Sequence, residues 1–138
     1  MNVKNGKVLD VAGNRDAEGN NVIVWKRHNG LNQRWKILYL DEKKEEPTTG
    51  LDVDSGLHRN RAFYIISRLP GKRAIQVNHG NSHLKIMKFK RDEQSQLFYF
   101  DHLTRTIKSQ QYKGKSIDIQ SSGRGRQVQI WRTNARWW

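Results

Sequence analysis

The chain has 138 residues, the length of about one domain, and its 26 Lys and Arg against 13 Asp and Glu give a formal net charge of +13. It contains no cysteine, which excludes a disulfide framework, a thiolate metal site and a cysteine nucleophile. No apolar run is long enough to span a membrane and the first residues lack the apolar core of a secretory signal, so with the missing cysteines an intracellular location is weakly favoured.

A pattern of two short strands and an aromatic tetrad occurs three times along the chain. Each copy begins with a Gly-Lys pair and an alternating strand, at 6–11, 71–77 and 114–119. After a turn a second, β-branched strand follows, at 22–25, 84–87 and 128–131. A polar loop then leads to four residues that end in an aromatic side chain, at 32–35, 95–98 and 134–137, and we expect these aromatic side chains, such as Trp35 and Phe98, to fill a shared core. No stretch has a sustained helical period, so the chain is predicted to be all-β.

The spacing of the copies indicates a true repeat. Gly71 and Gly114 are 43 residues apart, and Gly6 and Gly71 are 65 apart, which is longer by the 22 residues of the polar stretch 41–62. We therefore expect a single domain, divided as repeat 1 at 1–40, an insertion at 41–62, repeat 2 at 63–102 and repeat 3 at 103–138. Three equal repeats of short strands favour a closed pseudo-threefold barrel, because closure removes sheet edges. A β-sandwich is the alternative, but it gives no reason for three equal periods.

The sequence of repeat 1 resembles a known family. Leu9-Asp10-Val11, Val22-Ile23-Val24-Trp25 and Asn32-Gln33-Arg34-Trp35 are similar to the ricin B-type lectin pattern with its Gln-x-Trp signature. The resemblance implies a β-trefoil in which each repeat can bind a sugar. It implies that an Asp accepts hydrogen bonds from sugar hydroxyls, that an aromatic ring stacks on the sugar, and that an Asn completes the hydrogen bonding.

Carried over residue by residue, the resemblance gives candidate carbohydrate-binding residues in two repeats. The repeat 1 candidates are Asp10, Trp25, Asn32 and Gln33. The repeat 3 candidates are Asp118, Gln129, Trp131 and Asn134, although Ala135 stands where the signature has glutamine. Repeat 2 has Gln76 in place of the Asp and Met87 or Lys88 in place of the aromatic, so its site is predicted to be inactive.

Each candidate also has a purely structural interpretation. Asp10 and Asp118 are equally suited to capping tight turns, because Asp bonds nearby backbone amides. Trp25 and Trp131 are equally suited to packing. Gln33 and its repeat 2 counterpart Gln96 are better explained as buried amides that satisfy loop backbone groups.

The positive charge is concentrated in the second half of the chain. Residues 63–138 carry a net charge of +11, whereas residues 1–62 carry +2. We predict that one basic face contacts an anionic partner such as an acidic protein, RNA or a sulfated polymer, with the candidates Lys85, Lys88, Lys90, Arg91, Arg124, Arg126 and Arg132. The alternative is a solvated surface that keeps the protein in solution.

No catalytic pair, cofactor site or metal site is predicted. The segment Asp52-Val53-Asp54-Ser55-Gly56 only partly matches a calcium loop, and Gly80 and Asn81 between His79 and His83 disfavour a helical zinc site. The preferred function is a non-catalytic carbohydrate-binding module. The alternative is a structural trefoil that has lost its sugar sites and docks onto an anionic surface. Both ends look short for three full repeats, so we expect a part of a larger protein or an edge completed by a partner strand.

Overall fold

The computed structural model describes residues 6–41, 56–119 and 127–133. This part of the chain contains ten strands and three short 3-10 helices. The strands are β1 (Lys7–Val11), β2 (Val22–Lys26), β3 (Trp35–Tyr39), β4 (Phe63–Ser67), β5 (Ala74–Val77), β6 (Leu84–Met87), β7 (Phe98–Asp101), β8 (Thr106–Ser109), β9 (Lys115–Ile119) and β10 (Val128–Arg132). The 3-10 helices are η2 (Ala12–Asn14), η3 (Leu31–Gln33) and η4 (Gln94–Gln96). The all-β prediction is confirmed.

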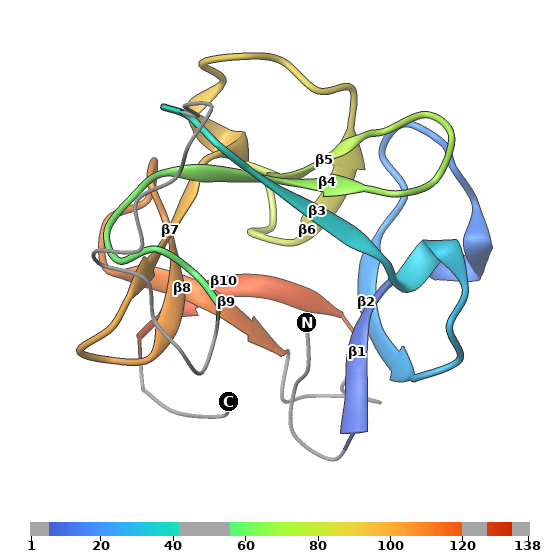
Figure 1. Cartoon of the computed structure of the whole chain (residues 1–138), viewed down its shortest axis with the longest axis horizontal. Coiled ribbons are helices and arrows are strands. Elements are labelled where there is room, and N and C mark those ends of the chain that lie inside the picture. Colours follow the sequence, from blue (N-terminus) through green and yellow to red (C-terminus); the bar gives the residue numbers. More distant parts are fainter. Residues whose placement is uncertain (1–5, 42–55, 120–126, 134–138) are drawn as a thin grey trace.

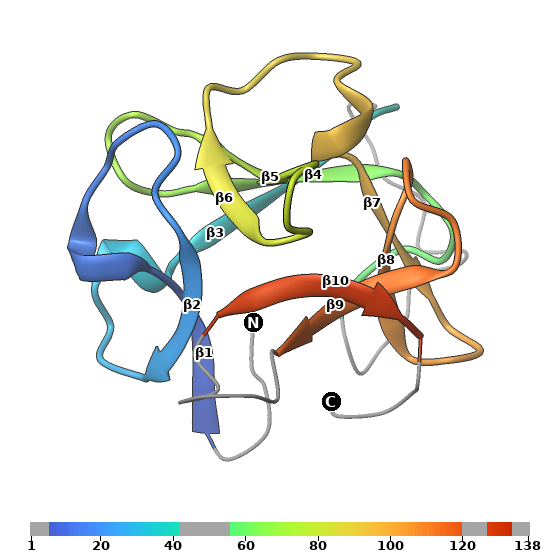
Figure 2. The ribbon, with the colours of Figure 1, turned by 180° about the vertical axis from the view of Figure 1, so that it is seen from behind.

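Three antiparallel hairpins repeat around a common centre (Figures 1 and 2). They are β1–β2, β5–β6 and β9–β10. Each hairpin is joined to the next by one antiparallel bridge, and the bridges are Asn21 to Lys85, His83 to Gln129 and Gln127 to Ile23. The same kind of contact occurs in every bridge. The residue just before the second strand of one hairpin pairs with the second residue of the second strand of another hairpin. The three repeats are therefore related by an approximate threefold axis.

The remaining strands connect the hairpins β5–β6 and β9–β10 into an eight-stranded sheet, whereas β1–β2 forms a sheet of its own. β4 pairs with β3, β5 and β7, β7 pairs with β8, and β8 pairs with β9. Figure 1 shows β3 and β4 side by side, and β7 beside β8. No helix in the described ranges is long and apolar enough to cross a membrane.

The core consists of side chains from equivalent positions of the three repeats. Strand alternation places every second residue inward, and the buried sets are Leu9, Ile75 and Ile117, then Val22, Leu84 and Val128, then Val24, Ile86 and Ile130. The prediction that the tetrad aromatic fills the core is confirmed for Phe98, which is 0% exposed. Trp35 is only partly buried; it packs against the core, and its Nε1 donates to the Leu9 carbonyl at 3.2 Å. Trp137 lies outside the described residues.

A partly buried ion pair fastens β7 to β8. Lys108 Nζ lies 2.8 Å from Asp101 Oδ2, and Asp101 Oδ1 accepts the Leu103 N–H at 2.9 Å. Burial raises the pKa of Asp101, but the hydrogen bonds from Lys108 and Leu103 outweigh it and leave the pKa below its ordinary value of 3.8. Because the folded pKa lies below the unfolded one, the ionised carboxylate stabilises the fold above about pH 4 and loses this effect as the pH falls through the folded pKa.

We therefore expect the Asp101→Asn variant to be less stable than the native protein at pH 7, and the difference to shrink as the pH falls below about 4. Thermal melting of both proteins between pH 7 and pH 2.5 measures this. A difference in melting temperature that stays constant across that range would contradict the ion-pair assignment.

Candidate functional site

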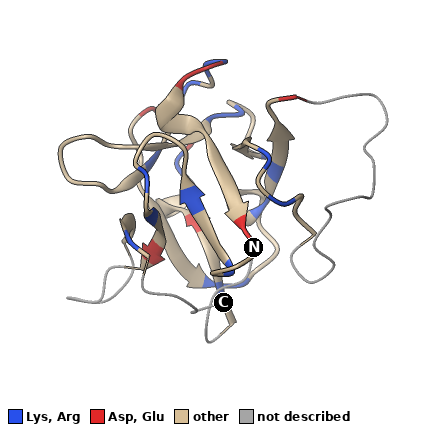
Figure 3. Cartoon of the chain, turned by 90° about the vertical axis from the view of Figure 1, so that its left-hand side faces the viewer, with Lys and Arg blue, Asp and Glu red and all other residues tan. Residues whose placement is uncertain are grey.

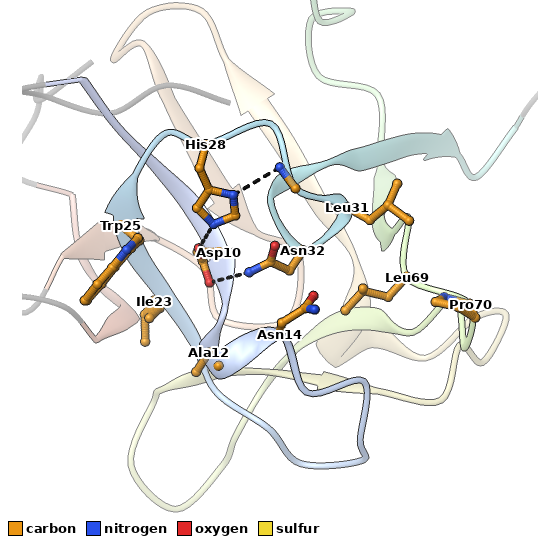
Figure 4. Close-up of a pocket in the computed structure, with 12 residues that line it drawn as sticks. Asp10, Ala12, Asn14, Ile23, Trp25, His28, Leu31, Asn32, Leu69 and Pro70 are labelled. Carbon is orange, nitrogen blue, oxygen red and sulfur yellow. Dashed lines mark hydrogen bonds and ion pairs between the residues drawn. The ribbon is translucent and has the colours of Figure 1, made fainter.

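The candidate site of repeat 1 is built on the β1–β2 hairpin. Asp10 on β1 lies opposite Ile23 on β2. Trp25 lies two residues further along β2, so it shares a face of the hairpin with Ile23 and sits diagonally to Asp10. The helix η3 brings Asn32 and Gln33 to the same end of the hairpin. The structure therefore brings all four repeat 1 candidates together (Figure 4 labels Asp10, Trp25 and Asn32).

Asp10 is a buried carboxylate held by two side-chain amides. It is 3% exposed, and its Oδ1 accepts a hydrogen bond from Asn32 Nδ2 at 3.1 Å while its Oδ2 accepts one from Gln33 Nε2 at 2.8 Å. Asn32 Nδ2 also donates to the Val11 carbonyl at 3.3 Å. These donors fix the orientation of the carboxylate, and each oxygen keeps a lone pair for a further donor.

Both polar atoms of the Gln33 side chain make hydrogen bonds within the protein. Besides its bond to Asp10, its Nε2 donates to the Lys26 carbonyl at 2.8 Å and its Oε1 accepts the His28 N–H at 2.8 Å. Gln96 makes the same three contacts in repeat 2, with Gln76, the Lys88 carbonyl and the Lys90 N–H. The glutamine therefore anchors the loop after the second strand and orients the residue on the first strand.

His28 is a site residue that the sequence pattern did not indicate. Its Nδ1 accepts the Gly30 N–H at 3.1 Å, so in the neutral ring the proton is on Nε2, which faces Asp10 Oδ2 at 3.7 Å (Figure 4). The turn that aims His28 requires glycine at position 30. A Cβ at Gly30 would lie 2.6 Å from both the His28 ring and Asn32 Oδ1. No spacing in the sequence signals this contact, because it depends on how residues 27–30 fold back.

A cavity of about 870 Å³ is lined by Asp10, Trp25, His28 and Asn32. Asp10 and Asn32 lie at its floor, and Trp25, which is 39% exposed, stands at its edge (Figure 4). Leu69 and Pro70 of repeat 2 line the opposite side together with the exposed Leu31. The volume suits a small ligand, and the lining combines apolar surface with a few fixed polar groups, as ligand pockets do. The sequence of repeat 1 alone could not indicate that Leu69 and Pro70 of repeat 2 line this cavity.

Comparison with known proteins agrees with this architecture. Residues 1–53 match the sequence profile of the family described as Ricin-type beta-trefoil lectin domain-like. The C-half of an earthworm R-type lectin, solved with GalNAc, aligns at a TM-score of 0.61 with 22% identity, over 94% of this chain and 85% of that one. The fold is a β-trefoil.

Two further solved structures share the trefoil. The designed threefold-symmetric protein ThreeFoil aligns at a TM-score of 0.63 with 19% identity, over 92% of this chain and 82% of that one. The β-trefoil lectin of the Vibrio vulnificus hemolysin/cytolysin, solved with N-acetyl-D-lactosamine, aligns at 0.61 with 23% identity, over 98% and 85%. No curated protein sequence matches the chain significantly.

The repeat 3 candidates occupy the equivalent places of the trefoil. Asp118 on β9 lies opposite Gln129 on β10, with Trp131 two residues further along and 48% exposed. Gln129 Nε2 donates to Asp118 Oδ2 at 3.4 Å. Asn134 lies outside the described residues. Repeat 3 therefore repeats the acid and the tryptophan of repeat 1, with a glutamine where repeat 1 has Ile23.

The basic candidates lie on and beyond two strands of the trefoil. Lys85 lies on β6, Lys88, Lys90 and Arg91 are exposed beyond its end, and Arg132 is exposed at the end of β10. The antiparallel bridge between His83 and Gln129 joins β6 to β10, and the ends of the two strands point away from each other in Figure 2. A single basic face formed by these residues stays a prediction. Arg124 and Arg126 lie outside the described residues.

Charge of both signs is mixed on the surface. Figure 3 shows Lys and Arg on several elements of one side, with Asp and Glu among them. Within the described ranges no cluster of three or more His, Asp or Glu could hold a metal ion. Asp52 and Asp54 of the segment compared with a calcium loop lie outside those ranges. His79 is instead paired with Tyr112, whose hydroxyl bonds its Nδ1.

Proposed function

We propose that the chain is a non-catalytic carbohydrate-binding module whose principal site is the repeat 1 cavity. The observation that carries the proposal is the oriented Asp10 carboxylate at the floor of a cavity edged by an exposed tryptophan. A pyranose has hydroxyl groups around its rim and a C–H face, so it matches a fixed carboxylate beside a flat ring. The fold is shared with lectins that were solved with GalNAc and N-acetyl-D-lactosamine bound.

Each side chain has a distinct role in this proposal. Asp10 accepts hydrogen bonds from two sugar hydroxyls, and the Asn32 carbonyl oxygen, which accepts no hydrogen bond from the described residues, accepts a third. Trp25 stacks on the C–H face of the sugar. Gln33 positions Asp10 and does not itself contact the ligand, because its polar atoms are used within the chain.

Repeat 3 is proposed as a secondary site. Asp118 and Trp131 supply the same chemistry, but among the described residues a single side-chain amide, that of Gln129 at 3.4 Å, donates to Asp118, whereas two amides hold Asp10. The Asp118 carboxylate is therefore less firmly oriented before a sugar arrives. We expect repeat 3 to bind neutral sugars more weakly than repeat 1.

Trp25→Ala tests the assignment, with Trp131→Ala as a matched control. Both tryptophans are exposed and occupy equivalent strand positions. We expect Trp25→Ala to weaken binding of neutral glycans about tenfold, because it removes the stacking surface. Trp131→Ala should change it less. The measurement is a glycan array followed by calorimetry with the best neutral ligand, and a larger loss in Trp131→Ala would move the principal site to repeat 3.

A further inference from the structure

A second cavity lies at the equivalent place in repeat 2, the repeat predicted to be inactive. It has a volume of about 250 Å³ and is formed by the β5–β6 hairpin together with Gly19 of the repeat 1 loop. Gln76, Asn78, His79, Lys85 and Met87 line it. All of these residues are described, and none of them belongs to the repeat 1 cavity.

Strand register shows how the chemistry differs from repeat 1. β5–β6 places Gln76 opposite Lys85, as β1–β2 places Asp10 opposite Ile23. Lys85 therefore stands where repeat 1 has an isoleucine, and an amide stands where it has a carboxylate. Met87 takes the place of the tryptophan and keeps an apolar side chain there. Compared with repeat 1, the repeat 2 hairpin therefore lacks the negative charge of the aspartate and carries the positive charge of Lys85.

Each side-chain acceptor of this cavity already takes part in one hydrogen bond. Gln96 Oε1 accepts the Lys90 N–H, so its Nε2 must donate, and it donates to Gln76 Oε1 at 2.9 Å. Asn78 Oδ1 accepts the Gly80 N–H at 3.1 Å. The Tyr112 hydroxyl bonds His79 Nδ1.

The side-chain groups that remain without a hydrogen bond are donors. The side-chain NH₂ groups of Gln76 and Asn78 and the Lys85 ammonium make no hydrogen bond within the described residues. His79 Nε2 is a further donor in the tautomer whose Nδ1 accepts the Tyr112 hydroxyl. Several unbonded donors, one of them positively charged, face a small space whose side-chain acceptors are each already bonded once, and this arrangement suits a ligand that carries negative charge.

No acidic side chain neutralises Lys85 in the described part of the chain. The loop that contributes Gly19 to the cavity also carries Asp16 and Glu18, and both carboxylates accept hydrogen bonds from other groups. Glu18 accepts from Arg73 Nε at 2.5 Å and from the Lys88 N–H at 2.8 Å, and Asp16 accepts from Arg73 and from the Gly71 N–H. These contacts fix the loop that carries Gly19 against repeat 2. They also leave the charge of Lys85 available to a ligand.

We propose that the repeat 2 cavity binds a sugar that carries a carboxylate or sulfate group. The anionic group lies against Lys85 and the Gln76 amide, with Asn78 and His79 as further donors and Met87 as the apolar wall beside the ring. This site is distinct from the neutral-sugar site of repeat 1. The chain would then recognise two kinds of sugar on neighbouring repeats.

Calorimetric titration of the full chain in 0.15 M NaCl tests the proposal. The probes are glucuronate and galactose 6-sulfate, with glucose and galactose as their neutral counterparts and inorganic sulfate as the bare anion. We expect at least one acidic sugar to bind more tightly than its neutral counterpart and than sulfate, and the tighter acidic sugar identifies the anionic group. Lys85→Gln should weaken that binding at least about tenfold, since it removes a charge-assisted hydrogen bond.

Lys90→Gln is the matched control, because Lys90 is exposed and does not line the cavity. It changes the net charge equally and should alter binding less than about twofold. Asp10→Asn should leave acidic-sugar binding unchanged, so failure of the repeat 1 proposal is distinguishable from failure of this one. Equal effects of Lys85→Gln and Lys90→Gln, no preference for the acidic sugars, or equally tight binding of inorganic sulfate would overturn the proposal.

Discussion

Replacing Asp10 with alanine is expected to weaken binding of a neutral sugar by roughly 1.5–3 kcal/mol, the usual contribution of hydrogen bonds to a charged group. The carboxylate is held in place before the sugar arrives, because Asn32 and Gln33 each donate to one of its oxygens. A preorganised acceptor loses little freedom on binding, so most of its interaction energy contributes to affinity. Calorimetry with the neutral ligand selected on the array measures the loss.

The same substitution removes one hydrogen bond from each of two buried amides, which keep only their bonds to the Val11 and Lys26 carbonyls, so it also costs stability of about 1–3 kcal/mol. A control must separate this cost from the loss of a ligand contact. Gln76→Ala serves, because it removes the equivalent contact with Gln96 in repeat 2 without touching the repeat 1 cavity. We expect Gln76→Ala to lower the melting temperature and to retain neutral-sugar affinity. Equal losses of affinity in both variants would attribute the effect of Asp10→Ala to destabilisation.

The sequence predicted the parts of this molecule that depend on local patterns. The 43-residue period marked the three hairpins, since turn residues and β-branched strands recur at fixed intervals, and it separated the stretch 41–62 from them. The resemblance of repeat 1 to the ricin B-type lectin pattern indicated Asp10, Trp25 and Asn32, which the structure places on one hairpin and the loop that follows it. Phe98 was correctly predicted in the core, because strand alternation places it inward.

Other features depend on contacts between repeats, and these the sequence could not predict. Leu69 and Pro70 reach the repeat 1 cavity from repeat 2, and Lys85 faces Gln76 only through the strand register. The expected shared basic face depends in the same way on contacts between repeats. It requires particular directions of β6 and β10 away from the bridge between His83 and Gln129, and closeness in sequence or in repeat number does not determine these directions.

Replacing Phe98 with alanine is expected to lower the free energy of unfolding by about 3–5 kcal/mol, the usual cost of removing a buried aromatic ring. Phe98 is 0% exposed and lies where three strands meet, opposite Phe63 on β4 and Ser109 on β8. The strands around it are fixed by their own backbone pairing, so they cannot close over the space left behind. A loss of this size approaches the whole stability of a marginal domain. Urea denaturation followed by tryptophan fluorescence measures it.

Two other substitutions serve as comparisons for Phe98→Ala. Leu103→Ala removes a large apolar side chain that is 82% exposed, so it should change the unfolding free energy by less than about 0.5 kcal/mol. Trp35→Ala, at the position equivalent to Phe98, should cost less than Phe98→Ala, because Trp35 is only partly buried even though its Nε1 bonds the Leu9 carbonyl. The order Phe98, Trp35, Leu103 follows the burial of the three side chains. A Phe98→Ala protein as stable as Leu103→Ala would show that the aromatic position of repeat 2 does not support the common core.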